Sequence, residues 1–442
     1  MITTNEVLRR VLLVLIFAGA ATFAMGIGYI VPERPTMALA GAFAVLVFGA
    51  AVAQPALLPV AAMPLLVVVL RVGGGGVDLT VSDFVLGLVF WPALILSPKP
   101  FSRELRYLLW LNVVYQAATL LTVVANPYLA NVVEWFHAWL LVSGALIVGW
   151  AVGRAGFGKI GLTLFLLACV ALAIPTVAEG ALQWASGDFS EVYPKYPWSM
   201  HKNFIGTLLC FAAILAYAHP TWMGWSGRWA MSAFWLFAVG IAMSQSRQAL
   251  LALGVALLVV SFRKPGEKRR SILAILAIIP TGYFVATLIR DQIASGNVHN
   301  SVFQRLNWFG DTIALWERSP LLGHGLRYWT TGRTEERFQP PNAFLEVLAS
   351  TGIVGIAAFV MLFGGMLVVL WRLDPDYGTV AFALVLARLV QSQFDLFWIA
   401  ITVSVPLVVS GIAIGALAHR ETNSPIATNK SAGTTMSIGS VA

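Results

Sequence analysis

Charged residues are scarce in this chain: they make up only 11% of its 442 residues, whereas 59% are hydrophobic. A soluble domain carries about a quarter of charged residues, because its surface must face water. An apolar surface of this extent can be covered only by lipid, and within a bilayer only helices or closed barrels satisfy every backbone polar group. The apolar runs are long and do not alternate, so the composition excludes an ordinary soluble enzyme and predicts membrane-spanning helices.

Cysteine is almost absent, and so are common catalytic motifs. The two cysteines, Cys169 and Cys210, both lie inside apolar runs, which excludes a disulfide framework and a cysteine-rich zinc site. The H-E-x-x-H, C-x-x-C and P-loop patterns do not occur. We therefore expect no metal ion and no cofactor.

The net charge of +8 does not indicate a nucleic-acid partner. Basic residues lie in short loops between apolar segments, where membrane topology and lipid headgroups account for them. We expect membrane lipids as partners and no nucleic acid.

Apolar segments of spanning or near-spanning length follow one another along the chain. They lie at about 11–31, 37–53, 56–71, 80–97, 105–124, 132–152, 160–184, 203–218, 229–244, 247–262, 271–290, 344–371, 378–397 and 399–418. Only Gln54 and Pro55 separate the second segment from the third, so a tight hairpin there would reduce the count from about fourteen to about twelve. The prediction is an all-α, polytopic transmembrane bundle of about 12–14 spanning helices.

Lys and Arg in the short loops predict the orientation, because such residues stay on the cytoplasmic side. The most basic stretch, 263–270, is therefore placed in the cytoplasm. Alternating outward from it puts the other basic loops on the same side and both termini in the cytoplasm. These loops contain Arg9, Arg10, Lys99, Arg103, Arg106, Arg154, Lys159, Arg228, Arg372 and Arg420.

The only long hydrophilic stretch, 291–343, then lies outside the cytoplasm. We expect residues 1–420 to form one transmembrane domain that includes this loop, and residues 421–442 to form a disordered cytoplasmic tail. Positive charge in an outer loop opposes the orientation rule. Either long loops translocate regardless of charge, or the loop binds an anion such as a diphosphate. The arginines of the loop are Arg305, Arg318, Arg327, Arg333 and Arg337.

Several polar residues lie at predicted outer ends of helices or in the outer loop. Arg247, preceded by Ser246, has a guanidinium suited to phosphate oxygens, or it is an arginine that reaches from a helix end to the interface. Arg305 lies in a stretch spaced like an amphipathic helix on the membrane surface. His324 lies in a Ser-Pro-Leu-Leu-Gly-His-Gly turn, where backbone N–H groups could approach a ligand, although a structural turn is the simpler interpretation.

Two further candidates lie at the outer start of a helix. His201 and Lys202 stand beside several aromatic residues, which form either an interfacial belt or a sugar-stacking surface.

Three candidates belong to the last apolar segments. Asn342 is suited to cap a helix, and Glu346, one turn later, is favoured there by the helix dipole alone. Arg388 shares one face of the penultimate predicted helix with Gln391 and Asp395. We expect this face to look into the bundle, either as an internal ion pair or as a functional site.

Three stretches, in this order, resemble the O-antigen ligase and polymerase family of bacterial envelope glycan assembly. They are Ser-Gln-Ser-Arg247 followed by Ala-Leu-Leu-Ala-Leu, Arg305 followed by the turn around His324, and Asn342-Ala-Phe-Leu-Glu346 leading to Ser-Thr-Gly-Ile-Val-Gly. The long outer loop between the later helices also matches. The resemblance covers residues 240–360 and rests elsewhere on hydropathy.

The resemblance implies a glycosyltransferase of the bacterial inner membrane. Such an enzyme moves a glycan from a polyprenyl-diphosphate carrier to a hydroxyl of a lipid or glycan acceptor on the outer face, with inversion and without a metal ion. By this resemblance Arg247 and Arg305 bind the diphosphate and stabilise its charge as it leaves. The further substrate-binding candidates are Ser246, His201, Lys202, Asn342, Glu346 and Arg388.

The general base does not carry over, because Pro341 stands where many family members have histidine. His324 is the first substitute for it, followed by His299 and Glu336.

Two other functions stay open at this point. One is a transporter of a small anion, with Arg388 and Asp395 at its site; the sequence shows neither the paired broken helices nor the inverted repeat of many transporters. The other is a non-catalytic scaffold in an envelope complex.

Overall fold

The computed structural model describes residues 56–72, 79–263, 301–333, 339–398 and 400–423, together with Thr22, Met25, Gly49, Gln54, Thr287 and Arg290. The chain divides into two units, residues 1–58 and 59–442, and the architecture below is that of the second unit. The predicted segments at about 11–31, 37–53 and 271–290 fall almost entirely outside the described residues. His299, Glu336 and the tail beyond Asn423 also fall outside them.

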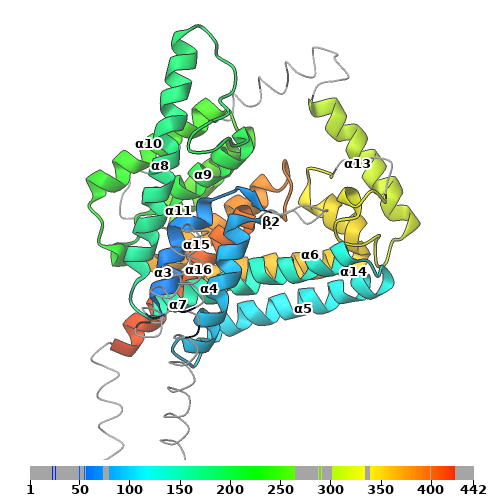
Figure 1. Cartoon of the computed structure of the whole chain (residues 1–442), viewed down its shortest axis with the longest axis horizontal. Coiled ribbons are helices and arrows are strands. Elements are labelled where there is room, and N and C mark those ends of the chain that lie inside the picture. The colour runs from blue at the N-terminus through cyan, green and yellow to red at the C-terminus, as the bar shows by residue number, and fades with distance from the viewer. Residues whose placement is uncertain are drawn as a thin grey trace, which may run out of the picture. The chain divides into compact units, whose positions relative to one another are not determined.

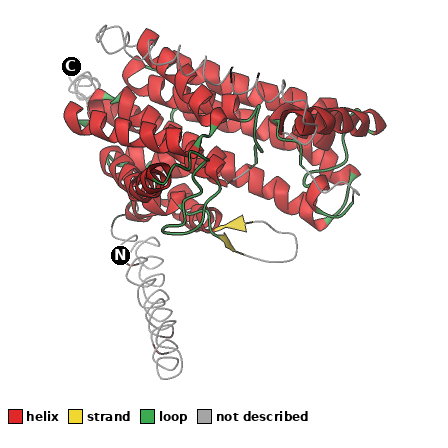
Figure 2. Cartoon of the chain, turned by 90° about the horizontal axis from the view of Figure 1, so that it is seen from above, coloured by secondary structure: helices red, strands yellow, loops and turns green. Residues whose placement is uncertain are grey.

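The described chain is almost wholly helical (Figure 2), which confirms the all-α class. The helices are α3 (Leu57–Ala62), α4 (Val81–Leu96), α5 (Arg103–Ala125), α6 (Leu129–Trp139), α7 (Ala145–Arg154), α8 (Gly158–Ala185), α9 (Lys202–Ala218), α10 (Gly227–Ser244), α11 (Arg247–Arg263), α13 (Ser301–Arg318), α14 (Ala343–Arg372), α15 (Pro375–Gln391) and α16 (Ala400–Asn423). A π-helical turn, Leu140–Gly144, joins α6 to α7. Two short strands, β1 (Arg71–Val72) and β2 (Leu79–Thr80), pair antiparallel before α4.

Five of the described helices are long and apolar enough to cross a membrane, so this is a multi-pass membrane protein. They are Arg103–Ala125, Leu129–Arg154, Gly158–Ala185, Ala343–Arg372 and Ile401–Asn423. Shorter apolar helices include Val81–Leu96 and Lys202–Ala218. The predicted total of about 12–14 spanning helices stays a prediction.

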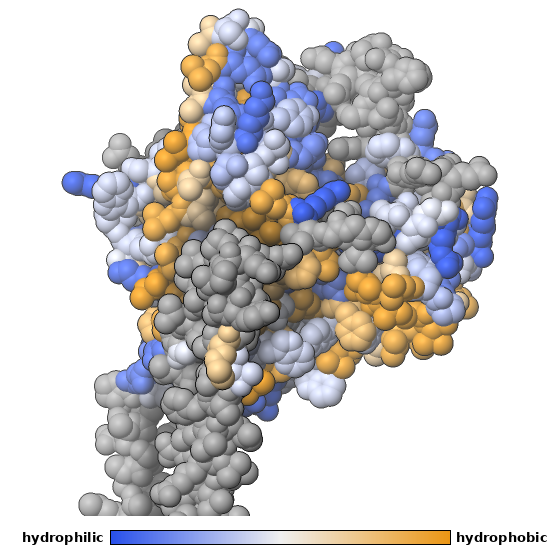
Figure 3. All heavy atoms as spheres, viewed as in Figure 1, coloured by the Kyte–Doolittle hydropathy of each residue, from blue (hydrophilic) through white to orange (hydrophobic). Residues whose placement is uncertain are grey.

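The helices pack in two groups that share α16 and α15. α5, the α6–α7 pair and α14 lie side by side, while α8, α9, α10 and α11 pack on one another (Figure 1). Hydrophobic side chains lie along α8 and over α5 and α14, whereas hydrophilic ones gather beyond the end of α8 (Figure 3). This distribution fits helices whose outer faces contact lipid.

Glycines allow α7 and α16 to pack with their backbones in contact. A Cβ at Gly149 would lie 2.0 Å from the carbonyl oxygen of Val408, and one at Gly411 would lie 2.3 Å from that of Leu146. Both helices carry glycines four residues apart, a spacing that brings membrane helices close together. The α7–α16 pair therefore forms the central contact of the described bundle.

The helix ends predicted to face the cytoplasm lie together. The Arg263 guanidinium donates to the carbonyl oxygens of Trp371 and Leu373 and lies 4.4 Å from the Trp371 ring. Arg420 forms an ion pair of 2.8 Å with Asp374. The basic ends of α11, α14 and α16 therefore share one end of the bundle, and their position on the cytoplasmic side stays a prediction.

The turn around His324 fills a break in α14. Gly352 has φ +65° inside this helix, which interrupts the backbone ladder. The freed carbonyl oxygens of Ala349 and Ser350 accept from the backbone N–H groups of His324 (3.1 Å) and Gly325 (2.9 Å). The Ser-Pro-Leu-Leu-Gly-His-Gly segment thus has a structural role, because it supplies hydrogen-bond donors to the kinked helix.

Gly352→Ala is expected to lower stability by about 2 kcal/mol or more. A left-handed backbone costs a residue with a Cβ about 1–2 kcal/mol, and the added Cβ would lie 2.2 Å from the carbonyl oxygen of Leu321. The midpoint of thermal unfolding in detergent measures the effect. Gly364→Ala is the control in the same helix, because nothing lies within 4 Å of its Cβ position. Equal midpoints for the two variants would show that the kink is not required.

One predicted helix face is wrong. The sequence predicts one helix over 378–397 that carries Arg388, Gln391 and Asp395, but α15 ends at Gln391. Arg388 Nη2 donates to the carbonyl oxygens of Leu396 (2.6 Å) and Phe397 (2.5 Å). These hydrogen bonds satisfy carbonyl oxygens of a loop that folds back after α15, and Asp395 lies in this loop. Hydropathy cannot distinguish such a loop from a continuing helix.

Candidate functional site

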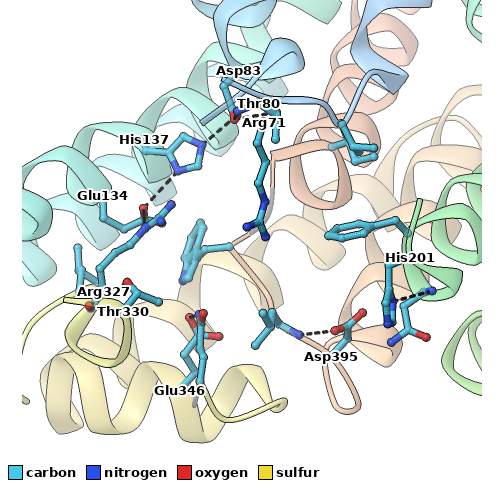
Figure 4. Close-up of a pocket in the computed structure, with 18 of the residues that line it drawn as sticks. Arg71, Thr80, Asp83, Glu134, His137, His201, Arg327, Thr330, Glu346 and Asp395 are labelled. Carbon is cyan, nitrogen blue, oxygen red and sulfur yellow. Dashed lines mark hydrogen bonds and ion pairs between the residues drawn. The ribbon is translucent and has the colours of Figure 1, made fainter. Parts of the chain in front are cut away.

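A cavity of about 490 Å³ opens where α4, α6, α9, α14 and the loops beside them converge (Figure 4). It lies at the ends of α6–α7 and α14 that are remote from the basic helix ends, because Glu134 and Glu346 are near the starts of these spans. The ionisable residues that line it are Arg71, Asp83, Glu134, His137, His201, Arg327, Glu346 and Asp395. The apolar lining includes Val69, Met200, Phe204, Val347, Trp398 and Ile401.

The loop after α13 is fixed against the α5–α6 connection. Tyr128 donates from its hydroxyl to the carbonyl oxygen of Leu326 at 2.6 Å, and the Leu326 N–H donates to Asn131 Oδ1 at 2.9 Å. The Arg333 guanidinium lies 4.0 Å from the centre of the Tyr128 ring, and burial raises the pKa of Tyr128. These contacts hold the next residue, Arg327, at the cavity wall with φ +60°.

One wall of the cavity is a chain of charged contacts. Arg327 Nε donates to Glu134 Oε2 at 2.6 Å, and the same oxygen lies 3.3 Å from His137 Nδ1. His137 Nε2 lies 2.9 Å from Asp83 Oδ1. Asp83 Oδ2 accepts from the backbone N–H of Thr80 at 2.7 Å, as part of the capping box of α4. The relative exposures of Asp83, Glu134 and His137 are 4%, 4% and 6%.

Two carboxylates line the opposite side. Glu346, in the first turn of α14, accepts from Gln339 Nε2 at 2.7 Å and is buried. Asp395 Oδ2 accepts from Gln248 Nε2 at 2.6 Å, and its Oδ1 accepts from the backbone N–H of Leu396 at 2.9 Å. Both carboxylates come from segments that are firmly anchored, so their positions in the cavity are fixed.

His201 and Lys202 separate into different environments. His201 lines the cavity and caps α9, because its Nδ1 accepts from the Asn203 N–H at 3.2 Å. Partial burial lowers the pKa of His201 and so favours the neutral ring, and because Nδ1 accepts from Asn203 the neutral ring carries its proton on Nε2, as a donor. Lys202 does not line the cavity but pairs with Glu191 at 2.9 Å, and this hydrogen bond lowers the pKa of Glu191.

Two of the candidate residues do not line the cavity but hold segments that do. Asn342 is confirmed as the cap of α14: its Oδ1 accepts from the N–H groups of Phe344 (3.0 Å) and Leu345 (3.1 Å). Arg388 is 2% exposed, does not line the cavity, and lies 4.9 Å from the centre of the Phe397 ring. Arg388 therefore holds the loop that carries Asp395.

The remaining candidates lie away from the described cavity. Arg247 is the first residue of α11 and is half-buried, while Ser246 is buried against Gly206 of α9. The His324 Nε2 lies 2.8 Å from the carbonyl oxygen of Leu315, so this nitrogen donates to the loop. Arg305 lies in α13, which confirms the predicted helix, but its side chain is not among those that the structure describes.

Sequence reasoning missed most of the charged lining. Asp83, Glu134 and His137 lie inside the predicted apolar segments at 80–97 and 132–152. Ionisable residues at such positions are costly in lipid and commonly mark functional sites, and this was the signal that could have found them. In the part of the chain that the structure describes, no group of three or more His, Cys, Asp or Glu side chains is arranged to hold a metal ion.

Comparison with known proteins gives a match to a protein family. Residues 232–360 match the family model described as O-antigen ligase, the region that the resemblance identified. No curated protein matches the chain. The matched region supplies Arg327, Gln339 and Glu346 to the cavity, whereas the Asp83, Glu134, His137 and His201 side of it comes from outside the match.

Proposed function

We propose that the chain transfers a glycan from a polyprenyl-diphosphate carrier to an acceptor hydroxyl, because residues 232–360 match the O-antigen ligase family model. The transfer takes place in the described cavity, on the non-cytoplasmic face of the bacterial inner membrane, with both termini in the cytoplasm. It requires no metal ion.

The observation that carries this proposal is the presence of guanidinium groups and a buried carboxylate in one cavity. Arg71 and Arg327 lie toward one side and Glu346 toward another (Figure 4). A diphosphate leaving group develops negative charge on the oxygen that departs, and fixed guanidinium groups stabilise that charge. An acceptor hydroxyl gives up a proton as it attacks, and a fixed carboxylate can take it.

The proposed step is a single displacement. The acceptor oxygen bonds to the anomeric carbon while the bond from that carbon to the diphosphate oxygen breaks. The electron pair leaves with the diphosphate, beside Arg327, and the proton passes to Glu346. Attack from the side opposite the leaving group inverts the anomeric carbon.

We assign the base to Glu346 in place of His324. Glu346 lines the cavity, whereas His324 uses its Nε2 to donate to Leu315. His201 contributes a neutral Nε2–H donor to substrate oxygens. Arg247 is retained as a contact for the diphosphate on the family resemblance; it does not line the described cavity, although its neighbour Gln248 bonds Asp395, which does.

Arg305 is retained as a second diphosphate ligand on the family resemblance alone. Asn342 and Arg388 hold the segments that carry Glu346 and Asp395, while Ser246 packs against α9. These three residues therefore maintain the shape of the site. Lys202 ties the start of α9 to Glu191.

The transporter hypothesis depends on Arg388 and Asp395 lining a shared anion site. Arg388 and Asp395 do not share a helix face, because Asp395 lies beyond the end of α15. The Arg388 guanidinium is bonded to backbone carbonyl oxygens of the loop at 392–398.

Purified wild type is expected to release polyprenyl diphosphate from a lipid-linked oligosaccharide when an acceptor is present, at the same rate in EDTA. Arg327→Ala should lower this rate by about 10²–10³-fold, the range seen when a donor to a developing anion is removed. Arg318→Ala is the matched control, because Arg318 is an exposed arginine at the end of α13 and does not line the cavity. Equal losses in both variants, or a rate abolished by EDTA, would contradict the proposal.

A further inference from the structure

An arginine that is paired with a buried carboxylate is a poor anion ligand unless the carboxylate is compensated elsewhere. Arg327 pairs with Glu134, which is 4% exposed. A simple ion pair of this kind carries no net charge, so it neither repels an anion nor attracts one strongly. The other members of the wall decide how much positive field Arg327 presents to the cavity.

The wall supplies the missing compensation through His137. Both ring nitrogens face carboxylate oxygens, Asp83 Oδ1 at 2.9 Å and Glu134 Oε2 at 3.3 Å. An ionised carboxylate only accepts hydrogen bonds, so both nitrogens donate and the ring is an imidazolium. Two carboxylates, one imidazolium and one guanidinium sum to zero, which is the form in which four charges can be buried together.

Glu134 Oε2 is shared between two cations. It accepts from Arg327 Nε at 2.6 Å and faces His137 Nδ1 at 3.3 Å. The two cations therefore share the negative charge of this oxygen, which neutralises only part of the positive charge of Arg327. The remaining positive potential of the guanidinium can attract an anionic ligand. Asp83, on the far side of the ring, stabilises the imidazolium that makes the division possible.

We propose that Asp83, His137 and Glu134 are positioning residues that act through Arg327. They orient its guanidinium by the Nε edge and keep it electropositive toward the diphosphate of the lipid-linked donor. This inference rests on the proposed function for the identity of the anion. It assigns a role to three residues of α4 and α6 that lie outside the matched region.

The test is a double-substitution cycle on the binding of undecaprenyl diphosphate to the purified full chain. Undecaprenol, which has the same chain and no diphosphate, measures the contribution of the lipid tail alone. Asp83→Asn is expected to weaken diphosphate binding about tenfold in the wild-type background but by less than about twofold when Arg327 is already lysine, because coupled sites are not additive. Arg327→Lys is chosen because recognition of the headgroup stays measurable.

Controls separate positioning from a loss of fold. Undecaprenol binding should be unchanged in Asp83→Asn when it is measured below the midpoint of thermal unfolding of this variant, which we expect to fall because one partner of a buried ion pair is removed. If that variant fails to fold through loss of the α4 cap, His137→Gln tests the same relay from its centre. Glu191→Gln, which breaks a partly exposed ion pair outside the cavity, should leave both lipids unaffected.

Each other outcome is decisive. Equal effects of Asp83→Asn in both backgrounds would overturn the relay and leave the proposed function standing. A wild type that binds undecaprenyl diphosphate no better than undecaprenol would overturn the proposed donor site, and the relay with it.

Discussion

Glu346→Gln is expected to lower glycan transfer by about 10²–10⁴-fold, the usual contribution of a positioned general base. The substitution keeps the size of the side chain and leaves an oxygen to accept from Gln339, so the start of α14 keeps its structure. The amide cannot take a proton from the acceptor hydroxyl. Single-turnover transfer from a lipid-linked oligosaccharide measures the loss.

The same variant should bind undecaprenyl diphosphate as tightly as wild type, because Glu346 is assigned to the acceptor and Arg327 to the diphosphate. Asp395→Asn is the paired variant, since Asp395 is the other carboxylate on that side of the cavity. Normal transfer by Glu346→Gln together with a large loss in Asp395→Asn would move the base to Asp395. Loss of carrier binding in Glu346→Gln would instead place this carboxylate in the donor site.

Hydropathy located the long spans well because a bilayer demands an uninterrupted apolar run. The segments expected at about 105–124, 160–184 and 344–371 correspond to α5, α8 and α14 within a few residues. It failed where the chain stays apolar but stops being helical. The end of α15 at Gln391 depends on contacts of one buried guanidinium with carbonyl oxygens several residues away, which no periodicity records.

The site was less predictable than the spans for a related reason. Asn342 and Glu346 could be located because a cap and a helix start are local in sequence. The wall of Asp83, His137, Glu134 and Arg327 forms only on folding: 54 residues separate Asp83 from His137, and 193 separate Glu134 from Arg327. Partners this distant cannot be paired from one sequence, although each isolated charge in an apolar segment was visible.

The segment 392–398 depends on Arg388, and Arg388→Ala is expected to destabilise the protein by about 3 kcal/mol. Arg388 is 2% exposed and donates to the carbonyl oxygens of Leu396 and Phe397. Hydrogen bonds from a charged group contribute about 1.5–3 kcal/mol each, and their loss leaves these buried acceptors without their donor. The midpoint of thermal unfolding in detergent should fall clearly below that of wild type.

Transfer should also be lost in Arg388→Ala at temperatures where the variant is folded, because the same segment places Asp395 and Trp398 at the cavity. Arg388→Lys should recover only part of either property, since an ammonium lacks the rigid, planar guanidinium that holds Nη2 against both carbonyl oxygens. Arg372→Ala, at the exposed end of α14, is the control and should change neither property. A variant at Arg388 with normal stability and no transfer would reverse the assignment, because the guanidinium would then act on the substrate and not on the loop.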